Sequence, residues 1–307
     1  MRYRFLLALL MLFFATAALA QSGPARPRIT GISHLAVYAS DPAATEHYYT
    51  VTSGAVKQPD PENPKGVRYA VSPTQFIEVL PLPADAGVNR MDHAAFNTED
   101  AEGLRNFLQL NGWPVPGSVT KEPDGSLWFE VRDPEANRIQ FVQPSSNSKV
   151  DAPNAVGHHI MHVGFLVHSR DKEDTFYHQL LGFKPYWYGG MVEGRTDWVS
   201  QQVPNGHDWL EYMVTSVSSG TATISQHQLG VLDHFSIGEN SVEDTYKILN
   251  DTGRLKGVQC DQGPKIGKDG KVQFNMYDPD QIRAELMSFH AVEKPCCSPF
   301  TAEDPTQ

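Results

Sequence analysis

Cysteine is scarce in this chain of 307 residues, which contains only Cys260, Cys296 and Cys297. Three thiols cannot make a disulfide framework, so the fold must depend on a packed core. One bridge from Cys260 to either of the other two is possible. A bridge between the adjacent Cys296 and Cys297 is a rarer option.

Basic residues are also in short supply. The chain has 25 lysines and arginines against 36 aspartates and glutamates, which gives a formal net charge of −11, and it contains no basic run. Proteins that bind nucleic acid through its phosphates need patches or stripes of lysine and arginine. The composition therefore argues against nucleic acid as a partner.

Only one long apolar run is present, Phe5–Ala20, and it is short for a membrane span. Arg2 and Arg4 precede it and it ends in Ala-Leu-Ala, which is the layout of a secretory signal peptide. We expect cleavage after Ala20 and a periplasmic or secreted protein with no transmembrane segment; an uncleaved anchor is the alternative. Loss of the two arginines would take the formal charge from −11 to −13.

Polar stretches rich in proline, glycine and serine divide the remainder into two blocks of similar length. The predicted segments are a signal peptide (1–20), a flexible tether (21–29), a first domain (30–143), a linker (144–157), a second domain (158–290) and an irregular tail (291–307).

The two blocks resemble each other, and each contains the same pattern twice. In every copy a histidine on an apolar strand precedes a helix that ends at a glycine. The histidines are His34, His93, His162 and His234, and the glycines are Gly54, Gly112, Gly182 and Gly253. Strands dominate and few helices are long. The sequence thus predicts an α+β fold of four strand–helix–strands units, with antiparallel or mixed sheets.

Superposition of the blocks aligns four polar residues in each. They are His162, Glu211, His234 and Glu285 in the second block, and His34, Glu78, His93 and Gln140 in the first. Glu285 lies in the stretch YDPDQIRAEL, whose alternation is typical of a strand. There Ile282, Ala284 and Leu286 would share one face, with Glu285 on the other.

Two imidazoles and one or two carboxylates on strands suit a divalent metal such as Fe, Mn, Ni, Co or Zn. A single strand histidine is more often a core residue, so the prediction depends on the whole set. Glu211 shares a strand face with Trp209 and Met213, where a buried carboxylate needs a cation. The first-block site is predicted to be weaker, because Gln140 is a neutral and poorer ligand.

These spacings resemble the vicinal oxygen chelate superfamily over residues 30–290. The superfamily includes glyoxalase, methylmalonyl-CoA epimerase, bleomycin and fosfomycin resistance proteins, and extradiol dioxygenases. The resemblance implies four βαβββ units in two tandem domains. It also implies metal ligands in the order found at His162, Glu211, His234 and Glu285.

The leading functional hypothesis is a glyoxalase- or epimerase-like lyase or isomerase. A metal would hold two vicinal oxygens of a small 2-oxo or 2-hydroxy substrate and stabilise an enediolate. Glu211 or Glu285 would move the proton as a general base.

The second hypothesis is an Fe(II) or Mn(II) extradiol dioxygenase acting on a catechol-type aromatic compound. His162, His234 and Glu285 would form its metal-binding triad. The family's acid–base histidine before the final Asp-Pro segment is missing. His207 is a possible substitute, and Asn275 and Tyr277 could donate hydrogen bonds to the substrate.

The third hypothesis is a non-catalytic binding protein, similar to the bleomycin-resistance members. Tyr186 and Tyr188 would contact a flat ligand, and Arg195 would meet an anionic group. A monomer and a homodimer are both compatible with the sequence.

Overall fold

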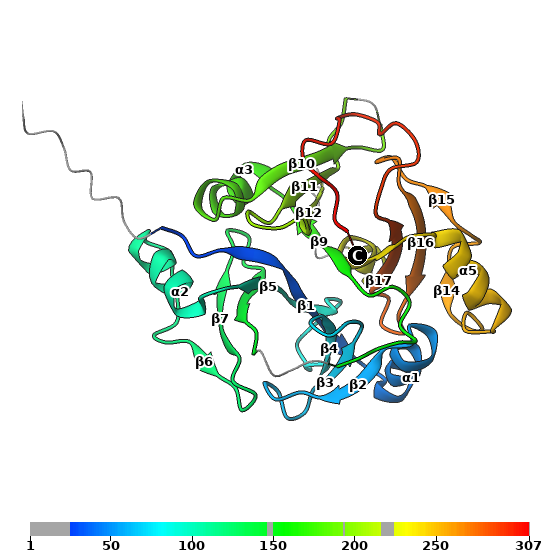
Figure 1. The fold of residues 1–307 in the computed structure, drawn as a ribbon, viewed down its shortest axis with the longest axis horizontal. Helices are drawn as coiled ribbons and strands as arrows, with labels where there is room; N and C mark the ends of the chain where they lie inside the picture. The colour runs from blue at the N-terminus through cyan, green and yellow to red at the C-terminus, as the bar shows by residue number, and fades with distance from the viewer. Residues whose placement is uncertain (1–24, 146–149, 193, 216–223, 307) are drawn as a thin grey trace, which may run out of the picture.

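The computed structural model describes residues 25–145, 150–192, 194–215 and 224–306 (Figure 1). The predicted signal peptide, residues 1–20, lies outside the described residues, so export stays a prediction. Among the helices of the described ranges, none is both long and apolar enough to cross a membrane.

The first sheet has eight strands in the order β2-β3-β4-β1-β5-β8-β7-β6. Its strands are β1 (Ile29–Ala39), β2 (Val56–Pro59), β3 (Val67–Ala70), β4 (Phe76–Pro81), β5 (Met91–Thr98), β6 (Thr120–Lys121), β7 (Leu127–Arg132) and β8 (Arg138–Gln143). The accompanying helices are α1 (Pro42–His47), which continues into a π-helical segment (Tyr48–Thr52), and α2 (Ala101–Leu110).

The second sheet has nine strands and repeats this order as β10-β11-β12-β9-β13-β17-β16-β14, with β15 paired to β16. Its strands are β9 (Ile160–Val167), β10 (Lys184–Gly189), β11 (Trp198–Gln202), β12 (Trp209–Val214), β13 (His234–Glu239), β14 (Gln259–Cys260), β15 (Lys265–Ile266), β16 (Val272–Tyr277) and β17 (Arg283–Ser288). Its helices are α3 (Arg170–Asp174), which continues into a π-helical segment (Thr175–Leu180), α4 (Gln226–Leu232) and α5 (Val242–Asp251).

The sheet order confirms the predicted α+β fold of four βαβββ units in two tandem sheets. At the centre of each sheet, the first and last strands of two units lie side by side, as β4-β1-β5-β8 and β12-β9-β13-β17. The first and last strands of each unit pair in parallel, and the first strands of the two units in a sheet, β1 with β5 and β9 with β13, pair antiparallel. Each of the eight aligned polar positions therefore falls on a central strand.

Local signals place the helix ends largely as predicted. Gly54, Gly112, Gly182 and Gly253 all adopt the positive φ that a glycine tolerates at a helix end. The Asp41 side chain caps α1 by accepting hydrogen bonds from two backbone amides.

Ser169 is the N-cap residue of α3. The Ser169 hydroxyl makes no capping bond to α3, and its backbone amide instead donates to the Glu135 carboxylate at 2.6 Å. A carboxylate is the stronger acceptor near a helix N-terminus, and this one comes from the turn between β7 and β8.

The two sheets share a continuous hydrophobic core. Tyr49 beside the first sheet donates to Asp278 of the second, and Tyr177 beside the second donates to Asp133 of the first, both at 3.1 Å. Each Asp-Pro turn thus accepts a tyrosine hydroxyl from the other domain. The precise domain limits, 30–143 and 158–290, stay predictions.

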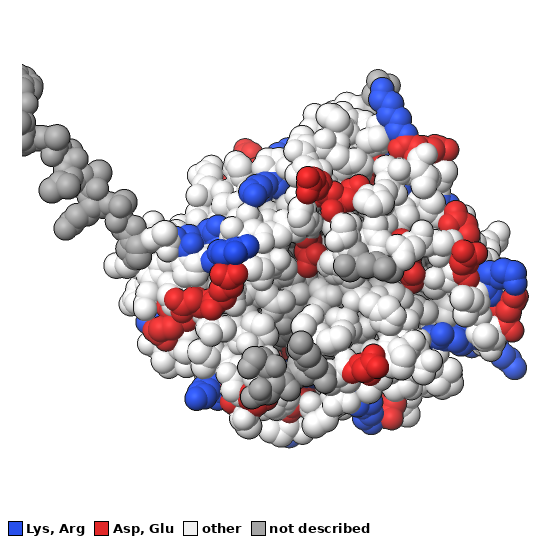
Figure 2. Space-filling model, viewed as in Figure 1, with Lys and Arg blue, Asp and Glu red and all other residues white. Residues whose placement is uncertain are grey.

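The tail is irregular in its described part and lies against the second sheet (red in Figure 1). Thr301 donates its backbone amide to the Tyr186 carbonyl at 3.0 Å, and Cys296 donates to Lys268 at 2.8 Å. Cys296 and Cys297 form the disulfide, the rarer of the two predicted options, and Cys260 is a free thiol. On the face in Figure 2, lysine and arginine side chains are scattered among acidic ones.

Candidate metal centres

The second sheet brings His162, His234 and Glu285 together on one face. The two Nε2 atoms lie 3.0 Å apart, and Glu285 Oε2 lies 3.4 Å from His162 Nε2. All three side chains are buried. The register explains the meeting, because His162 on β9 and Glu285 on β17 both lie opposite Ser236 on β13, two residues from His234. One potential ligand atom from each residue lies within 4.8 Å of the others.

Both histidines of this group can offer an imidazole lone pair. His234 Nδ1 lies 2.8 Å from the Leu232 carbonyl, so it carries the hydrogen and leaves Nε2 free to bind a cation. Burial, aided by the charge of Arg283, lowers the pKa of His234 to about 4, so the ring is neutral at pH 7. His162 Nδ1 is buried and has no hydrogen-bond partner within the described chain.

Two ionised carboxylates lie beside these imidazoles. Burial favours the neutral form of Glu285, but Arg283 and the two histidines outweigh it and hold its pKa at about 2. The pKa of Glu211 is also lowered, because its contacts with His234 and His162 outweigh burial. Buried negative charge of this density requires a compensating cation, so the donor set fits a divalent metal.

Glu211 differs from Glu285 in its access to solvent. Its Oε2 lies 3.3 Å from His234 Nε2, and its side chain is 14% exposed, compared with 3% for Glu285. Glu211 is outside the compact group of three. Its role as a fourth ligand stays a prediction, and it lines the adjoining cavity.

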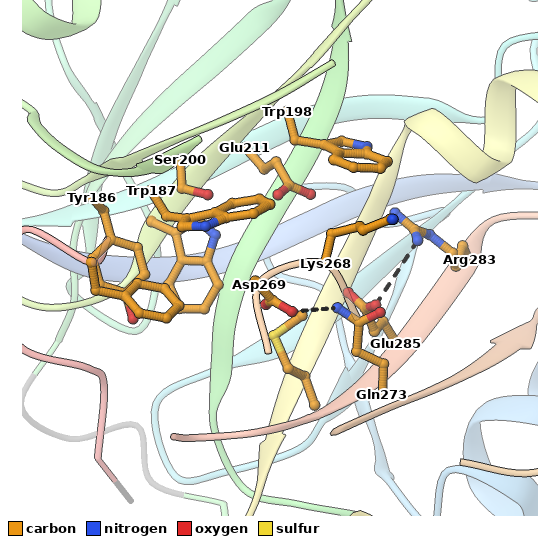
Figure 3. Close-up of a pocket in the computed structure, with 13 residues that line it drawn as sticks. Tyr186, Trp187, Trp198, Ser200, Glu211, Lys268, Asp269, Gln273, Arg283 and Glu285 are labelled. Carbon is orange, nitrogen blue, oxygen red and sulfur yellow. Dashed lines mark hydrogen bonds and ion pairs between the residues drawn. The ribbon is translucent and has the colours of Figure 1, made fainter. Parts of the chain in front are cut away.

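That cavity has a volume of about 100 Å³ and aromatic walls (Figure 3). Tyr186, Trp187, Trp198, Trp209 and Phe300 supply the rings. Its polar and remaining lining residues are Ser200, Glu211, Lys268, Asp269, Gln273, Arg283, Glu285 and Met287. The tail thus contributes directly to the site, through Phe300.

The structure brings only some of the other predicted residues to this cavity. Tyr186 is buried in its wall, whereas Tyr188 is exposed and Arg195 pairs with Asp197 at the surface. A β-bulge in β10 between Pro185 and Trp187 explains the difference, because it breaks the alternation that would have placed Tyr188 beside Tyr186.

The acid–base and hydrogen-bonding residues predicted for the dioxygenase hypothesis, His207, Asn275 and Tyr277, also lie outside the cavity lining. His207 is exposed in the turn between β11 and β12, where its Nδ1 lies 3.3 Å from the Glu303 carbonyl. Asn275 donates to Asp261 at 2.9 Å. Tyr277 lies opposite Arg283 and packs against the His227 ring.

Sequence reasoning missed two charged residues of this site. Asp269 lines the cavity, and burial raises its pKa to about 7. Lys271 is fully buried and contacts Asp304 of the tail at 2.8 Å. Both residues lie in the turn between β15 and β16, whose counterpart between β6 and β7 has Asp124 and Ser126 at the matching positions. The aligned polar residues all lay on strands, so this turn was not singled out.

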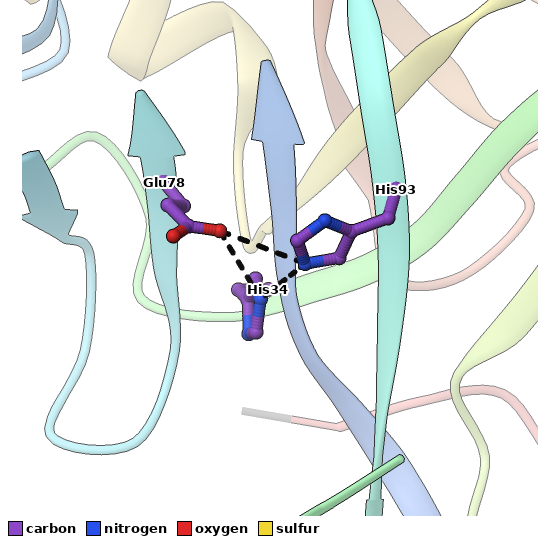
Figure 4. A group of neighbouring side chains, drawn as sticks. All are labelled: His34, Glu78 and His93. Carbon is purple, nitrogen blue, oxygen red and sulfur yellow. Dashed lines mark hydrogen bonds and ion pairs between the residues drawn. The ribbon is translucent and has the colours of Figure 1, made fainter. Parts of the chain in front are cut away.

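The first sheet builds a second group of the same kind from His34, Glu78 and His93 (Figure 4). The two Nε2 atoms lie 2.9 Å apart, and Glu78 Oε2 lies 3.8 Å from the first and 3.6 Å from the second. Asp92 Oδ2 lies 2.8 Å from His93 Nδ1, and burial lowers the pKa of His34 well below its usual value. The Nε2 atom of each ring can therefore direct its lone pair into the space beside Glu78.

Glu78 occupies a site that disfavours its charge in the absence of a cation. Burial, together with Asp60 and Glu62, raises its pKa to about 9. Gln140, the fourth aligned residue, is also buried; its amide nitrogen lies 2.5 Å from Glu62 Oε1. The prediction that this group is weaker depended on Gln140 alone, and the other three residues meet as closely as those of the second group.

Comparison with known proteins places this geometry in context. Residues 158–286 match the family model of the Glyoxalase/Bleomycin resistance protein/Dioxygenase superfamily. No curated protein sequence matches the chain.

Solved structures share the fold at low sequence identity. A catechol 2,3-dioxygenase is 16% identical with a TM-score of 0.60, over 91% of this chain and 94% of that one. The 2,3-dioxygenase LapB from Pseudomonas sp. KL28 is 14% identical with a TM-score of 0.65, over 90% and 97%. The Mn(II)-bound glyoxalase from Novosphingobium aromaticivorans is 17% identical with a TM-score of 0.61, over 85% and 83%.

The family match covers most of the second sheet, including His162, His234 and Glu285. The similarity of fold extends over both sheets. The second domain therefore matches the glyoxalase/bleomycin resistance protein/dioxygenase superfamily, also called the vicinal oxygen chelate superfamily, and both sheets share the fold of the solved structures described above.

Proposed function

We propose that the second domain catalyses a metal-dependent proton transfer, of the lyase or isomerase type, on a small 2-oxo or 2-hydroxy compound. The observation that carries this proposal is Glu211, an ionised carboxylate that is open to the cavity and adjacent to a His₂Glu group. His162, His234 and Glu285 would hold the cation. A bound divalent cation would polarise a substrate oxygen and acidify the neighbouring C–H bond.

Two carboxyl groups with different proton affinities face the cavity, as acid–base catalysis requires. The pKa of Glu211 is lowered, so it is ready to accept a proton, whereas the pKa of Asp269 is raised to about 7. When the surroundings of two carboxyl groups lower one pKa and raise the other, the group with the lower pKa is suited to act as the base and the other as the acid. We therefore assign Glu211 as the base and Asp269 as the acid.

This assignment predicts a pH profile. Asp269 donates a proton only while protonated, so turnover should be constant below pH 7 and fall as the pH rises through about 7. In Asp269→Asn the fall near pH 7 should disappear and turnover should be low throughout. Measurement of kcat between pH 5 and 9 tests this, and an unchanged descending limb in the variant would assign it to another group.

The cavity volume favours a small substrate. An engineered protein cavity that binds benzene has a volume of ~150 Å³, whereas this cavity has about 100 Å³. Lys268 and Arg283 add positive charge at its wall, which suits a substrate with a carboxylate. A two- to four-carbon 2-oxo or 2-hydroxy acid meets both conditions.

The second candidate function is extradiol ring cleavage, and the aromatic cavity walls favour it. Trp187, Trp198 and Trp209 could stack against a flat ring. The similarity to dioxygenase structures supports the fold and adds nothing on the reaction. Among the described cavity-lining residues there is no histidine to serve as the acid–base group.

One paired assay separates the two reactions. Protein loaded with Mn(II), Fe(II), Co(II), Ni(II) or Zn(II) is incubated in D₂O with 2-hydroxy and 2-oxo acids, and C–H exchange is followed by NMR while an electrode records oxygen. Exchange without oxygen uptake supports proton transfer. Oxygen uptake with catechol, without exchange in any acid, would replace the proposal with ring cleavage.

A further inference from the structure

We propose that a separate cavity, between the end of β13 and the connecting segment 153–159 that leads into β9, binds a small ligand with a protonated amino group on an apolar body. None of its lining residues lines the second-domain cavity, and none belongs to either group of possible metal ligands. The inference therefore goes beyond the proposed reaction and does not depend on it.

The position of this cavity follows from the alternation of side chains along β13. Its volume is about 550 Å³, which is within the range of small-molecule sites. Glu239, the last residue of β13, lines it. Because Glu239 lies five residues after His234, it has the parity of Phe235 and Ile237, which enter the core, and not that of His234. The carboxylate thus lies on the opposite side of the sheet from the metal-binding face.

Glu239 brings an unsatisfied acceptor to this cavity. The residue is only 9% exposed, and its Oε1 has no hydrogen-bond partner within the described ranges. Burial raises the pKa of Glu239 to about 7, and a hydrogen bond with Thr245 of α5 offsets that effect only in part. A buried carboxylate without a full set of donors is costly. A ligand that supplies a donor and a positive charge would remove that cost.

Comparison of the repeats shows that packing alone does not require a carboxylate here. Thr98 occupies the matching place in the first sheet, five residues after His93, and is also buried. Its hydroxyl donates to the Arg28 carbonyl, just before β1, at 2.8 Å. Glu239 instead faces Gly157, before β9, where an added Cβ would lie 3.2 Å from Oε1. The glycine therefore keeps the space beside the carboxylate open.

The other charged groups of the lining already have partners. Arg254 donates to three backbone carbonyls at 2.7 to 3.4 Å. His159 Nε2 lies 2.7 Å from Asp208 Oδ1, and His158 Nδ1 lies 3.2 Å from a backbone carbonyl. Glu239 is the one carboxylate among the described lining residues. An ammonium group supplies both the donor and the positive charge that it lacks, whereas a ligand with acceptors alone supplies neither.

Apolar side chains close to the carboxylate define the rest of the ligand. Val156 of the connecting segment, Ile248 of α5 and Phe289 after β17 line the same cavity. Ile248 is 56% exposed, so it offers apolar surface that a ligand can cover. Burial of a short hydrocarbon chain against these side chains would add to the binding free energy. A primary alkylamine has both parts.

Calorimetric titration with butylamine, 1-butanol and butyrate at pH 8 tests the ligand class. Butylammonium should bind at least ~10-fold more tightly than the other two. Glu239→Gln keeps the size of the side chain and removes its charge, so this preference should disappear. Two controls should titrate like the wild type: Glu243→Gln, exposed on α5, and Glu211→Gln, in the second-domain cavity. Circular dichroism checks the folding of each variant.

The pH dependence gives a test that needs no variant. Glu239 must be ionised to hold an ammonium group, so butylammonium should bind about tenfold more weakly at pH 6 than at pH 8. Equal affinity for butylammonium and butanol, unchanged binding in Glu239→Gln, or no binding of butylammonium to the wild type would overturn the proposal. Each of these results leaves the reaction proposed for the second domain untouched, so the two proposals can fail separately.

Discussion

Glu211→Gln is expected to lower turnover by about 10²- to 10⁴-fold while the metal content of the second domain stays unchanged. The substitution keeps the size and hydrogen bonding of the side chain and removes only its ability to accept a proton. Glu211 lies outside the compact group formed by His162, His234 and Glu285, so the cation should remain. Its exposure to the cavity is what makes it available to a substrate.

Kinetics and metal analysis on the same preparation test this prediction. Glu293→Gln is the matched control, because Glu293 is exposed on the tail and should show wild-type turnover. Full activity in Glu211→Gln would remove its role as base. Loss of metal in parallel with activity would instead make Glu211 a ligand, as the sequence first suggested.

Asp304→Asn is expected to lower the free energy of unfolding by about 3 kcal/mol, because it leaves the buried Lys271 charge unpaired. Lys271 is fully buried, and burial lowers its pKa despite the contact with Asp304. The Asp304 carboxylate also accepts hydrogen bonds from Tyr186 and His290. It therefore attaches the tail to the wall of the second-domain cavity.

Urea unfolding of the single and double variants measures this pair. Lys271→Met in the Asp304→Asn background should recover most of the lost stability, since no buried charge then remains. Glu303→Gln, one residue away, should unfold like the wild type, because within the described ranges Glu303 contacts Gln202 and His207 through its backbone carbonyl alone. A single variant as stable as the wild type would show that Lys271 is neutral or solvated in the folded protein.

The positions of the eight aligned polar residues could be predicted because these residues occupy matching places in the repeated units. A strand histidine, a helix and a glycine recur at matched spacings, and the sheet order places those strands side by side. Alternation along β17 likewise predicted that Ala284 and Leu286 enter the core and that Glu285 faces the opposite side.

The cavity beside the ligands could not be predicted in the same way. Phe300 reaches it from the tail and Asp269 from the turn between β15 and β16, and neither lies on a strand of the aligned set. Nothing local in the sequence indicates that the tail returns over the sheet. The surroundings of the first-domain group could not be predicted either. Gln140 suggested a poor ligand set, whereas Asp92 and Asn63, which orient His93 and Glu78, act through contacts visible only in three dimensions.

The most direct test of the central claim is the metal content of purified protein beside a His162→Ala/Glu285→Ala variant, measured by mass spectrometry after exposure to Mn(II), Fe(II), Co(II), Ni(II) and Zn(II). The variant should bind one equivalent fewer than the wild type. Equal metal content in the two proteins would contradict a metal centre in the second domain. Absence of metal from both would leave a protein that binds small molecules without metal chemistry.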